Sequence, residues 1–105
     1  MRRKRVYIPN RGSHDFTDAL KFGELIFITE GVVNKFALDS FFRTCIESMK
    51  GAEAEDYLMI TSLNSLCSIA TGILARRFGI VNFLLFRGGK YVERRVDFDS
   101  LAHLM

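Results

Sequence analysis

The chain has 105 residues, of which 49% are apolar and 26% are charged, and its formal net charge is +3. This length gives one domain with a small core, and this composition excludes a disordered, collagen-like or low-complexity chain. We therefore expect a single folded domain over residues 1–105, whose first residues, 1–5, form a basic N-terminal tail.

The positive charge gathers at two places in the sequence. Residues 2–5 carry four cations, whereas residues 6–75 carry five cations against nine acids. Residues 76–105 carry six cations against three acids. Four cations at a chain end are typical of a solvated terminus, and contact with phosphate groups, as in nucleic acid, or with an acidic partner is the alternative. The cations after residue 75 would form a basic patch only if the helix end and the following loop converge.

The two cysteines favour a reducing compartment. Cys45 and Cys67 lack the spacing of metal ligands, so we expect buried, reduced thiols in a cytoplasmic protein. Residues 57–75 carry no charge and approach the length of a membrane span. Because polar residues such as Thr61 and Ser62 interrupt this stretch, we expect a soluble interior and no membrane segment. No apolar segment follows the basic start, so we expect no signal peptide.

Strands and helices are expected to alternate along the chain, since apolar runs alternate with apolar residues at helical spacing. In chain order, the expected elements are a strand over 5–8, a short helix over 14–22, a strand over 24–29, a helix over 35–50, a strand over 58–60, a helix over 63–78, and strands over 80–86 and 91–98. Pro9 ends the first strand. Gly79 can end the third helix in the left-handed conformation.

This alternation predicts a mostly parallel sheet with right-handed crossovers. Residues 80–86 are almost all apolar, as in a strand that is covered on both faces. A hairpin turn over 87–90 leads into a last strand whose alternation suits an antiparallel edge with one exposed face. Val92, Val96 and Phe98 are expected on its covered face, and Tyr91, Glu93, Arg95 and Asp97 on its exposed face. The expected fold class is α/β, a single three-layer Rossmann-like or flavodoxin-like domain with an antiparallel C-terminal edge strand.

Polar residues follow the expected strands at their carboxyl ends, where open parallel sheets bind ligands. The ligand-binding residues that we expect there are Asn10, Arg11, Gly12, Ser13, Thr29, Glu30, Ser62, Asn64 and Arg87. Gly12 and Ser13 would offer backbone N–H groups to an anion, which Arg11 would clamp. The alternative is that the serine and asparagine side chains only cap helices, because caps require the same residue types.

Candidate catalytic residues are few. His14 and Asp15, with Glu30, supply the groups of an acid–base pair, although neighbouring residues on a helix do not face each other. A surface histidine beside an aspartate at a helix start is the alternative. Neither GxxxxGK[ST] nor GxGxxG is present, so we expect no cofactor. The same three residues lack a distinctive ligand spacing, so we expect no metal.

Three segments resemble small uncharacterised proteins of tailed phages. They are YIPNRGSHDF at residues 7–16, FGELIFITEG at residues 22–31 and YVERR at residues 91–95. The resemblance covers most of the chain. It implies an accessory protein made in a bacterial cytoplasm, and it brings no known activity and no catalytic residues.

The function that we expect is that of a small non-enzymatic binding module. It would engage a phosphate-bearing ligand, nucleic acid or a host protein at the strand-end rim and basic edge. One alternative is a small hydrolase or transferase for a nucleotide or phosphosugar, with His14 or Glu30 as base and Arg11 as anion clamp. Another is a structural protein that self-associates into a homo-oligomer through an edge strand or exposed phenylalanines.

Overall fold

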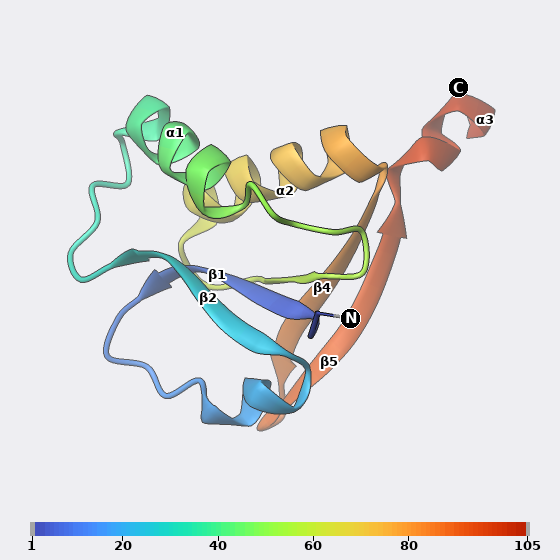
Figure 1. The fold of residues 1–105 in the computed structure, drawn as a ribbon. Coiled ribbons are helices and arrows are strands. Elements are labelled where there is room, and N and C mark those ends of the chain that lie inside the picture. The colour runs from blue at the N-terminus through green and yellow to red at the C-terminus, as the bar shows by residue number, and fades with distance from the viewer. Residues whose placement is uncertain (1, 105) are drawn as a thin grey trace.

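A five-stranded sheet runs through residues 2–104, the part of the chain that this computed structural model describes (Figure 1). In chain order, the elements are β1 (Arg5–Arg11), the 3-10 helix η1 (Thr17–Lys21), β2 (Glu24–Glu30), α1 (Leu38–Ser48), β3 (Tyr57–Met59), α2 (Asn64–Phe78), β4 (Ile80–Arg87), β5 (Lys90–Asp97), η2 (Phe98–Ser100) and α3 (Leu101–Leu104). Met1 and Met105, the ends of the predicted domain, lie outside the described residues.

The strand order is β2-β1-β3-β4-β5. Strands β1 to β4 are parallel, and β5 is antiparallel to β4. The predicted α/β class, the mostly parallel sheet and the antiparallel edge strand are confirmed. Gly79 ends α2 at a φ of 73°, and Gly88 and Gly89 form the β4–β5 turn at φ values of 58° and 81°. Glycine adopts this left-handed region without steric cost.

Helices α1 and α2 lie side by side on one face of the sheet, and the β1–β2 connection with η1 covers the other face (Figure 1). The core on the helix side includes Tyr7, Phe41, Met49, Leu58, Leu66 and Val81. The core on the η1 side includes Val6, Ile8, Phe16, Ala19, Met59 and Leu84. Because β1 alternates its side chains between the two cores, it is buried on both faces. The third layer is therefore thin, with one 3-10 turn in place of a full helix.

Two helix starts differ from the prediction, and a local side-chain hydrogen bond explains each. The expected helix over 14–22 is only the turn η1, because the Asp15 carboxylate accepts the N–H of Thr17 at 2.9 Å. Helix α1 begins later than expected, because Oδ1 of Asn34 accepts the N–H of Phe36 at 2.9 Å. Such bonds form turns that compete with the first helical turn.

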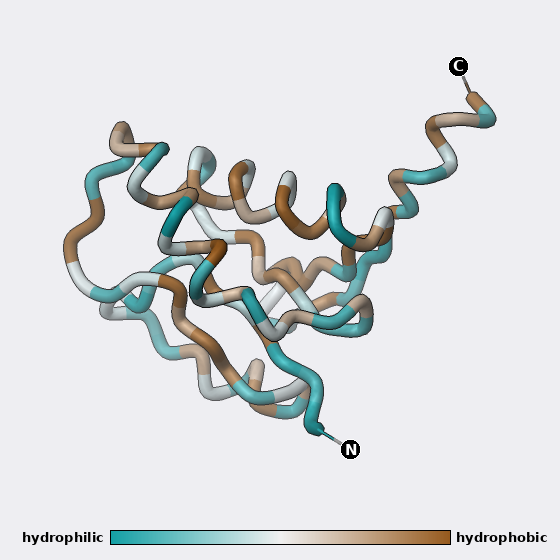
Figure 2. The backbone as a smooth tube through the Cα atoms, turned by 45° about the horizontal axis from the view of Figure 1, so that its top comes forward, coloured by the Kyte–Doolittle hydropathy of each residue, from teal (hydrophilic) through white to brown (hydrophobic). Residues whose placement is uncertain are grey.

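Strand β5 is less covered than its alternating pattern indicated. Val96 and Phe98, expected on a covered face, are 41% and 40% exposed. Helix α2 packs on β3 and β4, which leaves β5 at the rim. The chain then leaves the body through α3, as the hydropathy-coloured trace shows (Figure 2). No helix within residues 2–104 has the length and apolar character needed to cross a membrane.

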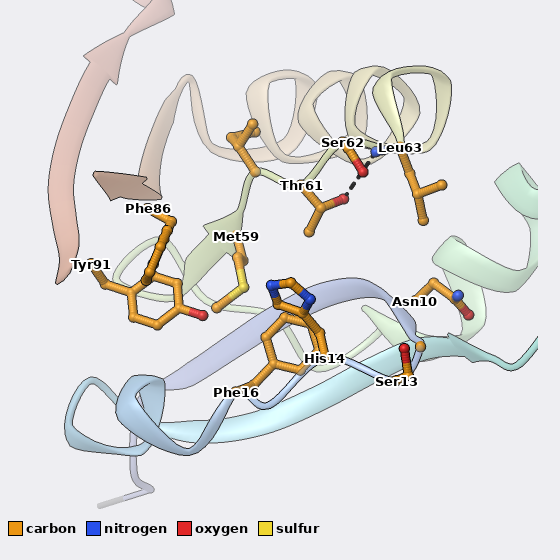
Figure 3. A pocket seen from close by; sticks show the side chains of 12 residues that line it. Asn10, Ser13, His14, Phe16, Met59, Thr61, Ser62, Leu63, Phe86 and Tyr91 are labelled. Carbon is orange, nitrogen blue, oxygen red and sulfur yellow. Dashed lines mark hydrogen bonds between the residues drawn. The ribbon is translucent and has the colours of Figure 1, made fainter. Parts of the chain in front are cut away.

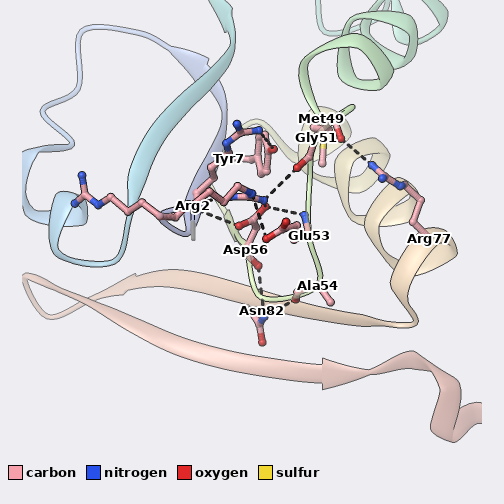
Figure 4. Close-up of polar contacts among 11 residues, drawn as sticks. Arg2, Tyr7, Met49, Gly51, Glu53, Ala54, Asp56, Arg77 and Asn82 are labelled. Atoms are coloured by element: carbon pink, nitrogen blue, oxygen red, sulfur yellow. Dashed lines mark hydrogen bonds and ion pairs between the residues drawn. The ribbon is translucent and has the colours of Figure 1, made fainter.

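A buried carboxylate ties several segments together at the amino ends of the strands (Figure 4). The Asp56 side chain accepts the backbone N–H of Arg5 at 3.0 Å and that of Glu53 at 2.8 Å, and it forms an ion pair with Arg2. Arg2 also pairs with Glu53 at 3.2 Å. The basic residues at the start of the chain are therefore bound to the domain through Arg2 and Arg5.

Candidate functional site

The carboxyl end of the sheet has a notch, because β3 is shorter than both of its neighbours. Strand β3 ends at Met59, opposite Leu84 of β4. Strand β4 continues to Arg87, and β1 continues to Arg11. Strand β1 pairs with β3 only near its start. Pro9, which has no N–H to donate, therefore lies beyond that ladder and is tolerated in a central strand. The predicted end of the first strand at Pro9 is wrong, because β1 continues to Arg11.

The notch opens into a pocket of about 470 Å³ (Figure 3). The residues that line it are Asn10, Gly12, Ser13, His14, Phe16, Met59, Ile60, Thr61, Ser62, Leu63, Phe86 and Tyr91. After β1 the chain turns to β2 on one side, whereas β3 and β4 follow on the other side. Connections that diverge in this way leave a crevice at the strand ends, where open α/β sheets bind ligands. The volume lies in the range of small-molecule sites.

One wall of this pocket is the connection between β3 and α2. The N–H of Leu63 donates to Oγ1 of Thr61 at 3.2 Å (Figure 3). The N–H of Thr61 donates to Sγ of Cys67 at 3.3 Å. Helix α2 begins at Asn64, and no side chain caps its N-terminus. The capping alternative is therefore wrong for Ser62 and Asn64. The partial positive charge of the helix N-terminus lies next to two residues of the pocket wall, Ser62 and Leu63.

A second wall is aromatic. The rings of Phe86 and Tyr91 meet edge to face with centroids 5.2 Å apart, and those of His14 and Phe16 lie 5.5 Å apart. Figure 3 shows Phe86 and Tyr91 across the pocket from Asn10. Phe86 is 60% exposed, so its ring is open to a ligand. Burial raises the pKa of Tyr91, so its phenol remains a hydrogen-bond donor at neutral pH.

Part of the predicted ligand-binding set meets in this pocket. The members that line it are Asn10, Gly12, Ser13 and Ser62. The members that do not line it are Arg11, Thr29, Glu30, Asn64 and Arg87. The carboxyl ends of the parallel strands share one end of the sheet, as expected, but the pocket occupies only the part between β1 and β4.

The members outside the pocket have contacts of their own. Nε of Arg11 pairs with Oε1 of Glu30 at 3.4 Å, and the guanidinium lies 3.9 Å from the centroid of the Phe27 ring. The expected anion clamp is therefore directed away from this pocket. Thr29 supports the pocket indirectly, because its hydroxyl donates to Oδ1 of Asn10 at 2.9 Å and so orients that amide.

The three candidate catalytic residues do not converge. His14 lines the pocket, the Asp15 carboxylate bonds to Thr17, and Glu30 pairs with Arg11. The hydrogen bonds from Thr17 lower the pKa of Asp15, which makes it a poor proton donor at neutral pH. Within residues 2–104, no carboxylate, lysine or arginine lines the pocket. Over the same range, no group of three or more His, Cys, Asp or Glu side chains is placed to hold a metal ion.

The aromatic wall was missed from the sequence. Tyr91 was assigned to the exposed face of an edge strand, and Phe86 was assigned to a buried strand. One signal was available, because the predicted turn over 87–90 places these two residues opposite each other. The structure pairs them in this way. Their distance from the ends of β1 and β3 depends on the strand order, which the sequence did not specify.

The fold and the pocket define a small α/β domain with a ligand-sized crevice at the carboxyl ends of its parallel strands. Residues 4–98 match the family described as Phage Pam3 gp32-like protein, and the chain belongs to this family. The predicted relationship to phage proteins is thereby confirmed. Neither the curated proteins nor the solved structures contain a match to this chain.

Proposed function

We propose that the chain is a small non-enzymatic binding module whose pocket takes a ligand with a planar ring and a phosphate group, of the nucleoside monophosphate class. The observation that carries this proposal is the pairing of two walls in one pocket. Phe86 and Tyr91 offer ring faces and edges for stacking, while the N-terminus of α2 begins next to the pocket residues Ser62 and Leu63 and places its partial positive charge near an anion bound there. Asn10 and Ser13 line the same pocket and supply neutral polar contacts.

The strand order supports the same location. The order β2-β1-β3-β4-β5 matches that of flavodoxin-like sheets, whose ligands bind between β1 and β3 at the point where the connections diverge. The antiparallel β5 departs from that pattern. We infer a reduced version of the doubly wound arrangement, in which the hairpin of β4 and β5 supplies the aromatic wall. Family membership supports an accessory role for a phage protein in a bacterial cytoplasm.

A thermal-shift titration tests this function. The probes are AMP, CMP, GMP and UMP, the four nucleosides, inorganic phosphate, and a short single-stranded oligonucleotide. Because a ligand of the folded state raises apparent stability by mass action, a monophosphate should raise Tm more than its nucleoside or inorganic phosphate does. A chain whose Tm does not respond to any monophosphate at millimolar concentration would refute the proposal. A response to the oligonucleotide alone would replace it with nucleic-acid binding.

A further inference from the structure

The pocket at the carboxyl end of the sheet contains one side chain that can gain a positive charge. This side chain is His14, in the connection between β1 and η1. Among the described residues that line the pocket, the others carry no charge at neutral pH. A phosphate group carries one or two negative charges, and burying such a charge without a partner is costly. The charge of His14 can therefore decide how tightly an anion binds here.

The imidazole of His14 is placed to contact a ligand. Its ring lies on that of Phe16, with the two centroids 5.5 Å apart, and Phe16 is buried in the core of the η1 side. His14 itself is exposed. Figure 3 shows both ring nitrogens of His14 on the side of the ring that faces away from Phe16. Since both nitrogens of a protonated imidazole donate hydrogen bonds, either one can bind a phosphate oxygen.

The nearest acid in the sequence favours the protonated form of His14. Hydrogen bonds from Thr17, and a weaker attraction to His14, lower the pKa of Asp15. The Asp15 carboxylate is therefore ionised at neutral pH, and a negative charge beside an imidazole stabilises its cation. Asp15 does not line the pocket, because its carboxylate is turned to Thr17. It can therefore support the charge of His14 without standing in the place of the anion.

The remaining titratable groups around His14 largely offset one another. Those that share a hollow with it are Arg3, Arg11 of β1, Asp15, Glu24 of β2 and, on the pocket side, Tyr91 of β5. Two of them are cations and two are acids. Burial, with weaker repulsion from Asp18 of η1 and from Asp15, raises the pKa of Tyr91, so its phenol stays neutral. Arg11 is paired with Glu30, and Arg3 donates to the carbonyl of Leu20 at 2.6 Å.

We propose that protonated His14 binds the phosphate group of the ligand, so that binding in this pocket is coupled to the uptake of a proton. This role depends on the proposed function, because it concerns the same pocket and the same ligand class. Histidine is the side chain whose ordinary charge change falls between pH 5 and 8. Because a hydrogen bond between two charged groups is about twice as strong as one between neutral groups, affinity should rise as the pH falls through this range.

Calorimetric titration at several pH values is the first test, with AMP and its methyl ester as ligands. A phosphate monoester loses its second proton near pH ~6, whereas the methyl diester has no second proton and keeps one charge. Wild type should bind the diester about 10-fold more tightly at pH ~5.5 than at pH ~8. His14→Gln should bind it weakly at both pH values. His103→Gln is the matched control, since His103 is exposed on α3, outside the pocket, and it should retain the wild-type pH dependence.

The outcomes separate this role from the proposed function. Repeating the titration at neutral pH, in two buffers of different ionisation enthalpy, should show proton uptake by wild type and none by His14→Gln. Binding with the same pH dependence in wild type and His14→Gln, for AMP and for the diester, would overturn the role of His14 and leave the proposed function intact. A folded chain that binds no monophosphate at any pH would refute both. Because His14 is exposed, His14→Gln should unfold at the wild-type temperature, which checks that the variant is folded.

Discussion

The amino and carboxyl ends of the sheet are formed by the same four parallel strands, and their polar groups are used in different ways. At the amino end, the polar groups form hydrogen bonds and ion pairs with other groups of the protein. The Asp56 carboxylate accepts hydrogen bonds from two backbone N–H groups and forms an ion pair with Arg2 (Figure 4). The Arg77 side chain donates to the carbonyl of Met49 at 2.7 Å, and the Asn82 side chain donates to the carbonyl of Ala54 at 2.9 Å.

At the carboxyl end, polar groups border an open space. Ser13 and Ser62 are exposed in the pocket wall, and the N-terminus of α2 has no side-chain cap. We infer that the amino end mainly stabilises the fold, and we propose the carboxyl end as the place where a ligand binds. Changes at the amino end should alter the free energy of unfolding and leave ligand affinity unchanged, whereas changes at the carboxyl end should do the reverse.

The largest expected effect is that of Asp56→Ala. It leaves two backbone N–H groups without an acceptor and Arg2 without one of its two carboxylate partners, at a residue that is only 3% exposed. We expect a loss of about 3 kcal/mol in the free energy of unfolding, measured by urea denaturation. Glu55→Ala is the control, because Glu55 is exposed next to it and should change stability by less than about 0.5 kcal/mol. A loss no larger than that of the control would show that the amino end is not locked as described.

The next effect is alkaline destabilisation through Tyr57, at the start of β3. Burial and a hydrogen bond to Glu93 raise the pKa of Tyr57 to about 12. The unfolded chain ionises this phenol at its usual pKa of about 10, so the stabilisation is complete below pH ~10 and is lost as the pH rises toward ~12. Wild type should lose about 2 kcal/mol more than Tyr57→Phe over this interval. Parallel pH profiles for the two proteins would contradict this assignment.

At the carboxyl end, Phe86→Ala should weaken binding of a nucleoside monophosphate by about 10-fold, since stacking on an aromatic side chain contributes roughly 1–3 kcal/mol per base. The free energy of unfolding should change little, because the ring is 60% exposed. Phe98→Ala removes a ring that is 40% exposed and lies outside the pocket, and it should leave the affinity unchanged. Calorimetric titration measures the affinity of wild type and both variants for the monophosphate. Equal losses of affinity in the two variants would show that Phe86 does not stack on the ligand.

The smallest expected effect is that of Ser62→Asp, which should raise the free energy of unfolding while lowering the affinity for a phosphate group. Ser62→Asp places a carboxylate next to the N-terminus of α2, which should stabilise the fold by about 0.5 kcal/mol through the helix dipole. The same charge should weaken phosphate binding several-fold. Ser40→Asp, in the first turn of α1, should give a similar gain in stability without the loss of affinity. Unchanged affinity in Ser62→Asp would mean that the phosphate does not bind at this helix N-terminus.

The elements with strong periodicity were predictable. Helix α2 and strand β4 follow from local sequence, because their apolar residues repeat at 3.6-residue spacing or run continuously, and Gly79 marks the boundary between them. The pocket was only partly predictable. Asn10, Gly12, Ser13 and Ser62 follow apolar runs that predict strands, and parallel strands share one end.

The remainder of the site depends on the lengths of the strands and on their pairing registers, which the local sequence does not encode. The notch exists because β3 stops at Met59 while its neighbours continue. Arg11 leaves the predicted site because β1 and β2 pair in a register that sets it opposite Glu30. The aromatic wall depends on the hairpin folding back along β4. Each of these features requires the strand order, which only the tertiary structure gives.

Amide chemical-shift mapping during titration with AMP and UMP locates a bound nucleotide residue by residue. We propose that ligands bind at the carboxyl end of the sheet and that the contacts at the amino end only stabilise the fold. We predict shifts confined to residues 12–14, 61–65 and 86–91, with residues 2–5 and 49–56 unaffected. Saturable shifts that centre on residues 2–5 and 49–56, or spectra that do not respond to either nucleotide, would contradict it.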